Sequence, residues 1–224
     1  MWLKKTDNTV SFFDMILFMG RREEKKRQTQ TRILDGSVQL FVDRGYERCT
    51  IDDIVKAAGI ARGTFYLYFE DKSSVFQALL DGLYQPIVEI LTTALKDMAK
   101  NNNTPLAHQI RYIKTAIDLA QLIESKQAAI PLHFREVWAA GVQGEAIRQW
   151  RQQIEELASQ LIASSIQHKL IRPVPPMLTA MAVVGSTERI IWGWLHGELP
   201  QSRRTLAQEL AALFWQGISP IAND

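Results

Sequence analysis

Residues 50–72, TIDDIVKAAGIARGTFYLYFEDK, predict two short helices joined by a tight turn. Thr50 is a good N-cap for the first helix, because its hydroxyl can accept a backbone N–H of the first turn. Two aspartates follow it, where the helix dipole favours acidic side chains. Gly59 is placed to end this helix, since glycine adopts the left-handed backbone of a helix C-terminus at little cost. The second helix begins at about Ala61, and the layout predicts a helix-turn-helix unit.

The second helix of this unit has two different sides. Phe65 and Phe69 form its buried side. The other side carries Arg62, Thr64, Tyr66 and Tyr68. In a helix-turn-helix unit, the N-terminal end of the second helix reaches base edges in the major groove of DNA. Arg62 is the best candidate to read a base, because a guanidinium can bind guanine O6 and N7 together.

A longer pattern in the same stretch resembles the DNA-binding signature of the TetR family of bacterial transcription regulators. The pattern G-x-x-x-x-T-[FL]-Y-x-[YH]-F-x-x-K is present as Gly59, Thr64, Phe65, Tyr66, Tyr68, Phe69 and Lys72. The junction F-x-x-x-G-[YF]-x-x-[TS]-[TS]-[IVM] precedes it between Phe41 and Ile51, with Cys49 where Thr or Ser is common. The resemblance covers about Thr29 to Leu83, and the rest of the chain is similar to the family only in length and helical pattern.

The resemblance implies a set of DNA contacts: Thr50, Arg62, Gly63, Thr64, Tyr66, Tyr68 and Lys72. Thr64 and Tyr66 would contact phosphates or a thymine methyl group, and Tyr68 and Lys72 would contact backbone phosphates. Thr50 could offer its N–H and hydroxyl to a phosphate at a helix start. Gly63 would let the backbone come close to DNA. The alternative for each of them is an ordinary solvated polar residue.

Composition bounds the class of protein. The chain has 224 residues, of which 46% are hydrophobic, enough for a sizeable core in one or two domains. Its net charge is only +2, and basic character is local: six basic and two acidic residues lie between Arg21 and Arg32. The single cysteine excludes an intrachain disulfide and fits a reducing cytoplasm.

Residues 1–26 are expected to be a disordered N-terminal extension. Its apolar part, residues 10–20, is short and interrupted by Asp14, so it does not predict a membrane span. A signal peptide is disfavoured because a charged run follows and no small-residue cleavage site is present. Met15 or Met19 is an alternative start of the native chain.

The rest of the chain predicts an all-α fold of about nine helices, with no strand-like alternation. Residues 27–73 would form the helix-turn-helix domain, with a first helix at about 28–44, and residues 74–224 a ligand-sensing and dimerisation domain. A helix from Lys72 into the 90s contains Pro86, and further helices are expected at about 105–123, 128–140, 143–170, 177–197 and 202–217. The helix at 105–123 has two apolar faces, which predicts a place in the middle of a bundle.

Two sets of candidate residues lie in the second domain. A cavity for a largely hydrophobic effector would be lined by Tyr112, His133, Phe134, Arg135, Trp138 and Trp192. A homodimer interface of two helices from each subunit would use Met181, Val184, Gly185, Ile191, Leu195, Leu206, Leu210 and Phe214. The alternative for the aromatic residues and for the interface residues is the ordinary core of one subunit. For His133 and Arg135 the alternative is a solvated helix face or a salt bridge.

The sequence gives little evidence of an enzyme. The four histidines, at 108, 133, 168 and 196, have no metal-ligand spacing, and no nucleophile or phosphate-loop motif is present, so neither a metal nor a cofactor is expected. The resemblance implies a homodimeric repressor that a small-molecule effector releases from a near-palindromic double-stranded DNA operator. Two alternatives stay open: a family member that activates or answers no ligand, and a helical ligand-binding or protein-interaction module without DNA binding.

Overall fold

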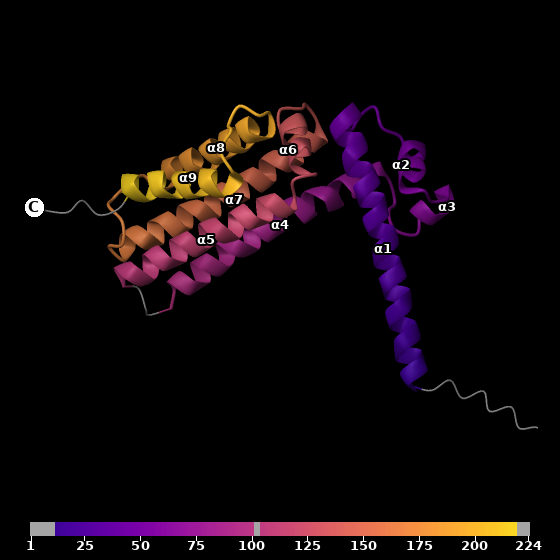
Figure 1. Ribbon diagram of the computed structural model, residues 1–224, viewed down its shortest axis with the longest axis horizontal. Helices are drawn as coiled ribbons and strands as arrows, with labels where there is room; N and C mark the ends of the chain where they lie inside the picture. Colours follow the sequence, from indigo (N-terminus) through magenta and orange to yellow (C-terminus); the bar gives the residue numbers. More distant parts are fainter. Residues whose placement is uncertain (1–11, 101–103, 219–224) are drawn as a thin grey trace, which may run out of the picture. The chain divides into compact units, whose positions relative to one another are not determined.

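The computed structural model describes residues 12–100 and 104–218, and all regular structure in these ranges is helical, which confirms the predicted all-α fold. The helices in these ranges, labelled in Figure 1, are α1 (Phe12–Arg44), α2 (Ile51–Ala58), α3 (Arg62–Phe65), α4 (Lys72–Met98), α5 (Pro105–Ser125), α6 (Ile130–Glu136), α7 (Val142–Gln167), α8 (Pro176–Leu195) and α9 (Arg203–Ile218). The chain divides into two compact units, unit 1 up to Val75 and unit 2 from Phe76.

The first helix begins earlier than predicted. α1 starts at Phe12 and not near Gln28, so residues 12–26 are helical where a disordered extension was expected. Side-chain pairs on its surface give one physical reason: Arg27 Nη2 lies 2.6 Å from Glu24 Oε2, and Gln28 donates to Glu24 Oε1 at 2.9 Å. Pairs three and four residues apart each stabilise an exposed helix by about 0.2–0.5 kcal/mol. Residues 1–11 of the expected extension lie outside the described residues.

The helices of unit 1 share one apolar core. Phe41 of α1, Ile54 of α2 and Phe65 of α3 are fully buried in it. Gly36 lets α1 and α2 approach closely, because a Cβ at this position would lie 3.2 Å from the Cβ of Ala57. The core therefore fixes α2 and α3 against the C-terminal half of a long helix.

Both ends of α2 are capped. Thr50 Oγ1 accepts the Asp53 N–H at 3.2 Å, while Asp53 Oδ2 accepts the Thr50 N–H at 2.9 Å, which is a reciprocal capping box. Gly59 ends the helix with φ +61°, as predicted. Arg32 of α1 adds a contact that the sequence did not reveal: its Nη2 donates to the carbonyl oxygens of Ala58 and Gly59, at 2.6 and 2.8 Å. A cation is favourable at this helix end, where carbonyl groups lack partners within the helix.

Unit 2 is a bundle of long helices that run along one another in Figure 1. α7 packs on α8, α5 packs on α9, and the short α6 contacts α7. α4 contains Pro86 in its interior, as predicted. None of the described helices is both long and apolar enough to cross a lipid bilayer.

The prediction that α5 lies in the middle of the bundle is wrong for one of its two apolar faces. Tyr112, Ala116, Leu119 and Ile123, which make up one face, line a partly open cavity. Of the other face, Leu106, Ile110, Ile113 and Ile117 are exposed, while Ala120 lines the same cavity. The periodicity of a sequence identifies an apolar face but does not say whether another helix of the same chain covers it.

Candidate nucleic-acid interface and ligand cavity

The segment that follows the turn after Gly59 carries the residues predicted to contact DNA. α3 is a single turn, and residues 66–68 continue it as turns. Phe65 and Phe69 are both buried, with ring centroids 6.0 Å apart, and so fix the segment on the core of unit 1. Of the predicted contact residues in this segment, Arg62, Gly63 and Tyr66 are exposed. Thr64 and Tyr68 are half-buried.

Arg62 is held in place by neighbours on both sides. Its Nη1 donates to Asp52 Oδ1 of α2, and its Nη2 donates to the Tyr66 hydroxyl at 3.4 Å. These hydrogen bonds, to Tyr66 first and then to Asp52, raise the pKa of the guanidinium, which keeps its charge. An exposed ion pair stabilises a fold little. The contacts of Arg62 therefore orient a cation at the N-terminal end of α3, where a base-reading side chain is needed.

Thr50 stands at the N-terminus of α2, as predicted, but its polar groups already have partners. Its N–H and its hydroxyl both donate to Asp53 Oδ2, at 2.9 and 2.7 Å. The hydrogen bonds from Thr50, the hydroxyl first and then the N–H, lower the pKa of the Asp53 carboxyl, which is therefore ionised at neutral pH. A phosphate at this helix start would have to take the Thr50 donors away from a carboxylate.

Lys72, predicted to contact a phosphate, makes two hydrogen bonds inside unit 1. Its Nζ donates to the carbonyl oxygens of Tyr46 and Cys49, both at 2.8 Å, and lies 4.1 Å from the centroid of the Tyr46 ring. The ammonium group thus ties the start of α4 to the connection between α1 and α2. Since an ammonium has three N–H groups, these two bonds use most of its capacity.

Replacing Lys72 with methionine is expected to lower the free energy of unfolding by about 2 kcal/mol, because two carbonyl groups would be deprived of a charged donor. Urea unfolding of the variant measures this, with Lys96→Met, a change at an exposed position of the same helix, as the matched control. If Lys72 instead bound a phosphate of DNA, the stability of the variant would be unchanged. The salt dependence of DNA binding would then become shallower by about one unit for each phosphate that the protein no longer neutralises.

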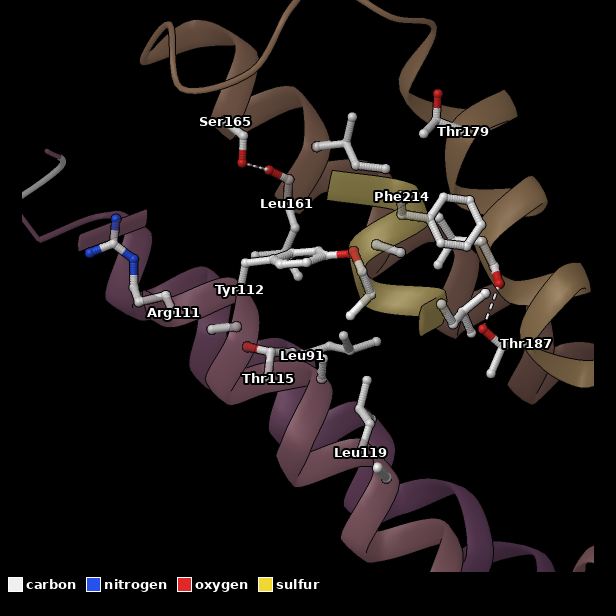
Figure 2. Close-up of a pocket in the computed structure, with 18 of the residues that line it drawn as sticks. Leu91, Arg111, Tyr112, Thr115, Leu119, Leu161, Ser165, Thr179, Thr187 and Phe214 are labelled. Carbon is white, nitrogen blue, oxygen red and sulfur yellow. Dashed lines mark hydrogen bonds between the residues drawn. The ribbon is translucent and has the colours of Figure 1, made fainter. Parts of the chain in front are cut away.

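A cavity of about 290 Å³ lies inside unit 2, between α4, α5, α7, α8 and α9. Its walls are mostly aliphatic and aromatic, and Figure 2 shows the Tyr112 ring projecting from α5 across it toward α9. Five residues with hydroxyl groups line it, one of them Thr115. The other four hydroxyls each donate to a backbone carbonyl at 2.7–3.0 Å: those of Tyr112, Ser165, Thr179 and Thr187. Because the hydrogens of these four hydroxyls are already donated, their oxygens could serve a ligand only as hydrogen-bond acceptors.

Of the six residues predicted to line a ligand site, only Tyr112 lines this cavity. Trp138 is 80% exposed. Phe134 and Trp192 pack against each other, with ring centroids 5.1 Å apart, and Arg135 lies 3.9 Å from Glu136. The other residues that line the cavity are mainly aliphatic and were not predicted to bind a ligand. They include Leu91, Met98, Leu161, Ile190 and Ile191.

His133, the sixth predicted residue, belongs to a separate polar network that joins four helices. The Tyr84 hydroxyl lies 2.5 Å from His133 Nδ1, and His133 Nε2 lies 3.5 Å from Glu188 Oε1. The same Glu188 oxygen lies 3.2 Å from Arg151 Nε. Burial, and then the charge of Arg151, lower the pKa of His133 to about 4, so the imidazole is neutral at pH 7. The network holds α4, α6, α7 and α8 together, which is a structural use of His133.

The predicted dimer residues fall into two groups. Ile191, Leu206, Leu210 and Phe214 line the cavity, so their apolar side chains have a role within one subunit. Met181, Val184, Gly185 and Leu195 lie on α8 and do not line it. Met181 is 49% exposed, and two neighbouring residues are more exposed, Leu178 of α8 at 65% and Leu213 of α9 at 66%. The surface of α8 and α9 therefore carries exposed apolar side chains beside the predicted Met181.

Comparison with known proteins places the helix-turn-helix unit in a family. Residues 33–79 match the family model described as bacterial regulatory proteins, tetR family. An uncharacterised regulator of Bacillus subtilis, YhgD, is 24% identical over 193 residues, which cover 84% of this chain and 95% of that protein. The transcriptional repressor BepR of Brucella suis is 25% identical over 188 residues, which cover 80% of this chain and 87% of BepR.

Solved structures share the whole fold. SmeT, the repressor of the Stenotrophomonas maltophilia multidrug efflux pump SmeDEF, has been solved in complex with triclosan. That structure has a TM-score of 0.67 and 18% sequence identity to this chain, and the match covers 87% of this chain and 93% of SmeT. The likeness therefore extends beyond the helix-turn-helix unit to the helical second half.

Proposed function

This chain is a TetR-family helix-turn-helix regulator of transcription, and we propose that it represses its target genes in the cytoplasm until an apolar small molecule binds. A homodimer would bind a near-palindromic operator through two copies of unit 1. An effector would enter the cavity of unit 2 and lower the affinity for DNA. BepR and SmeT, which are named as repressors, support the direction of the regulation.

The observation that carries the proposal is the surface of residues 62–68. Phe65 and Phe69 fix this segment on the core, while Arg62 and Tyr66 are exposed. Arg62 is also held in a defined orientation by its hydrogen bonds. We assign base reading to Arg62 and phosphate contacts to Thr64, Tyr66 and Tyr68. Thr50 and Lys72 hold the backbone of the unit, because their donors already bind Asp53 and two carbonyl groups.

Gly63 has no structural reason to be glycine. It is exposed, and a Cβ added to it would meet no other heavy atom within 4 Å. Glycine within a helix is less stable than alanine by about 0.5–1 kcal/mol. A close approach of DNA to the backbone would explain why the less stable residue stands here.

Gly63→Ala is therefore expected to stabilise the fold while weakening DNA binding. The free energy of unfolding should rise by about 0.5 kcal/mol, because helical propensity improves and nothing clashes. Affinity for the operator should fall about tenfold, because a methyl group would separate the backbone from DNA. Urea unfolding and fluorescence anisotropy on the same preparation measure both effects. Unchanged affinity together with higher stability would remove Gly63 from the interface.

The effector proposal depends on the character of the cavity. Its apolar walls favour an apolar ligand, and the triclosan complex of SmeT shows that a related fold holds one. α4 lines the cavity with Leu91, Ala94 and Met98 and begins at Lys72, within unit 1. We propose that α4 carries the response. For an effector to release DNA, it must bind more tightly to the conformation that does not bind DNA.

The dimer would form through α8 and α9, which contact each other in unit 2. Leu178, Met181 and Gly185 lie on one side of α8, and Leu213 is exposed on α9. A Cβ added at Gly185 would come no closer than 3.9 Å to a neighbouring side chain, so a helix of a second subunit could approach closely there. Two helices from each subunit would then form a four-helix interface.

Selection of DNA from a random pool by the purified protein tests the main proposal. Enrichment of a near-palindromic motif, with half-sites one helical turn apart, is expected for a dimeric reader. The affinity for that motif should fall steeply with salt, because phosphate neutralisation releases counterions. A folded dimer that enriches no sequence at low salt would overturn the proposal.

A further inference from the structure

The cavity contains a buried polar atom that its own surroundings leave unsatisfied. His108 of α5 lines the cavity and is only 7% exposed. Its Nδ1 is buried and has no hydrogen-bond partner among the described residues. A buried polar atom without a partner destabilises a fold, so one that stands at a ligand cavity indicates a partner that arrives with the ligand.

The imidazole of His108 is neutral. Burial, and then the positive charge of Arg111, lower its pKa to about 4. His108 lies in the first turn of α5, and its ring centroid is 5.7 Å from that of Trp215 in α9. A neutral imidazole with its proton on Nε2 presents Nδ1 as a hydrogen-bond acceptor.

Four other polar groups of the cavity favour the same kind of ligand. The hydroxyls of Tyr112, Ser165, Thr179 and Thr187 have already donated their hydrogens to backbone carbonyls. A ligand would therefore meet these oxygens as acceptors, in a mostly apolar cavity that Thr115 and Arg111 also line. The group that suits His108 and the four acceptor oxygens is a neutral donor, such as the hydroxyl of a phenol, on an otherwise apolar body.

We propose that His108 is the polar anchor of this cavity and that its Nδ1 accepts a hydrogen bond from the hydroxyl of a phenol-like aromatic effector. The inference deepens the proposed function, on which it rests for the cavity being the effector site. It goes beyond that proposal in naming the chemical group that distinguishes a good ligand from a merely apolar one.

Three related probes test it: 2-naphthol, 2-methoxynaphthalene and naphthalene. Only 2-naphthol can donate a hydrogen bond, while the apolar body is the same in all three. Wild-type protein should bind 2-naphthol about tenfold more tightly than either of the others, as one satisfied buried hydrogen bond implies. His108→Phe should reduce that preference to below about threefold and leave naphthalene binding unchanged, because the aromatic wall is kept. Intrinsic naphthol fluorescence and calorimetry measure the affinities.

Two further variants control the experiment. His168→Phe makes the same change at an exposed histidine that does not line the cavity, and it should keep the preference for 2-naphthol. His108→Leu serves as a second apolar variant if the phenylalanine does not fit. The thermal midpoint of the ligand-free protein should stay the same or rise in the His108 variants, since an unsatisfied atom is removed; a histidine with a structural role would lower it.

The outcomes separate the inference from the proposal on which it rests. Equal binding of 2-naphthol and 2-methoxynaphthalene, or a preference that survives in His108→Phe and His108→Leu, overturns the role of His108. Tighter binding of 2-naphthoic acid than of 2-naphthol also overturns it, in favour of a charged pair with Arg111, which lines the same cavity. Failure of DNA selection in the same preparation concerns the proposed function and leaves these affinities unaffected.

Discussion

Replacing Arg62 with alanine is expected to weaken operator binding by roughly a hundredfold or more. A bidentate contact between arginine and guanine contributes about 1–3 kcal/mol of discrimination, and the variant dimer would lack two of them. The unfolding free energy should hardly change, because Arg62 is exposed and its ion pair with Asp52 lies at the surface. Fluorescence anisotropy with the selected operator and with a scrambled duplex measures the effect, which should be largest on the operator.

Two other variants identify the reason for the weaker binding. Arg62→Lys keeps the charge but not the planar fork of donors, so it should lose most of the sequence preference and little of the affinity for scrambled DNA. Lys96→Ala, which removes an exposed positive charge from unit 2, should leave both affinities nearly unchanged. If Arg62→Ala weakened binding equally to both duplexes, Arg62 would be a phosphate contact and the base reader would lie elsewhere.

The helix-turn-helix unit could be predicted from sequence because its determinants are local. The Thr50 cap, the Gly59 turn and the buried pair Phe65 and Phe69 lie within 20 consecutive residues. The structure shows each of them. Contacts between distant residues escaped prediction. Lys72 binds carbonyls 26 and 23 positions away, and Arg32 caps α2 from 26 and 27 positions away. The family motif predicts that Lys72 contacts a phosphate. It does not show that the Tyr46 and Cys49 carbonyl groups lie within hydrogen-bond distance of the same ammonium.

The cavity and the surface of unit 2 were harder to predict for a different reason. An apolar helix face can pack in a core, line a cavity or meet another subunit, and its sequence is much the same in all three cases. α9 shows this, since Leu206 and Leu210 line the cavity while Leu213 is exposed. A usable signal was present in polar residues on apolar faces. Ser165 and Thr187 stand among aliphatic neighbours, and both line the cavity.

A second large effect is expected from the double variant Leu178→Glu/Met181→Glu, which should be monomeric at micromolar concentration. These two side chains are adjacent on one face of α8 and are 65% and 49% exposed, so the change should hardly disturb the subunit itself. In a dimer through α8 and α9, four carboxylates would be buried or brought close together without partners, which costs several kcal/mol. Light scattering gives the mass, and circular dichroism checks that the variant is folded.

The exposed face of α5 supplies the matched control. Ile110→Glu/Ile113→Glu places the same charges on another apolar helix face, exposed to a similar degree, and should leave the dimer intact. A monomer from the α5 variant, together with a dimer from the α8 variant, would move the interface to α5.

Loss of the dimer should also reduce operator affinity by more than a hundredfold, even though the residues of unit 1 are unchanged. A monomer contacts one half-site, and the second half-site adds to affinity only when the two reading units are joined at a fixed separation of about 34 Å. The α8 variant should therefore bind a single half-site duplex as well as wild-type protein does, while losing its advantage on the full operator. Arg62→Ala should bind both the half-site duplex and the full operator more weakly than wild-type protein does. This contrast separates a defect in reading DNA from a defect in assembly, and a half-site affinity that fell in the α8 variant would show that the substitutions had damaged unit 1 instead.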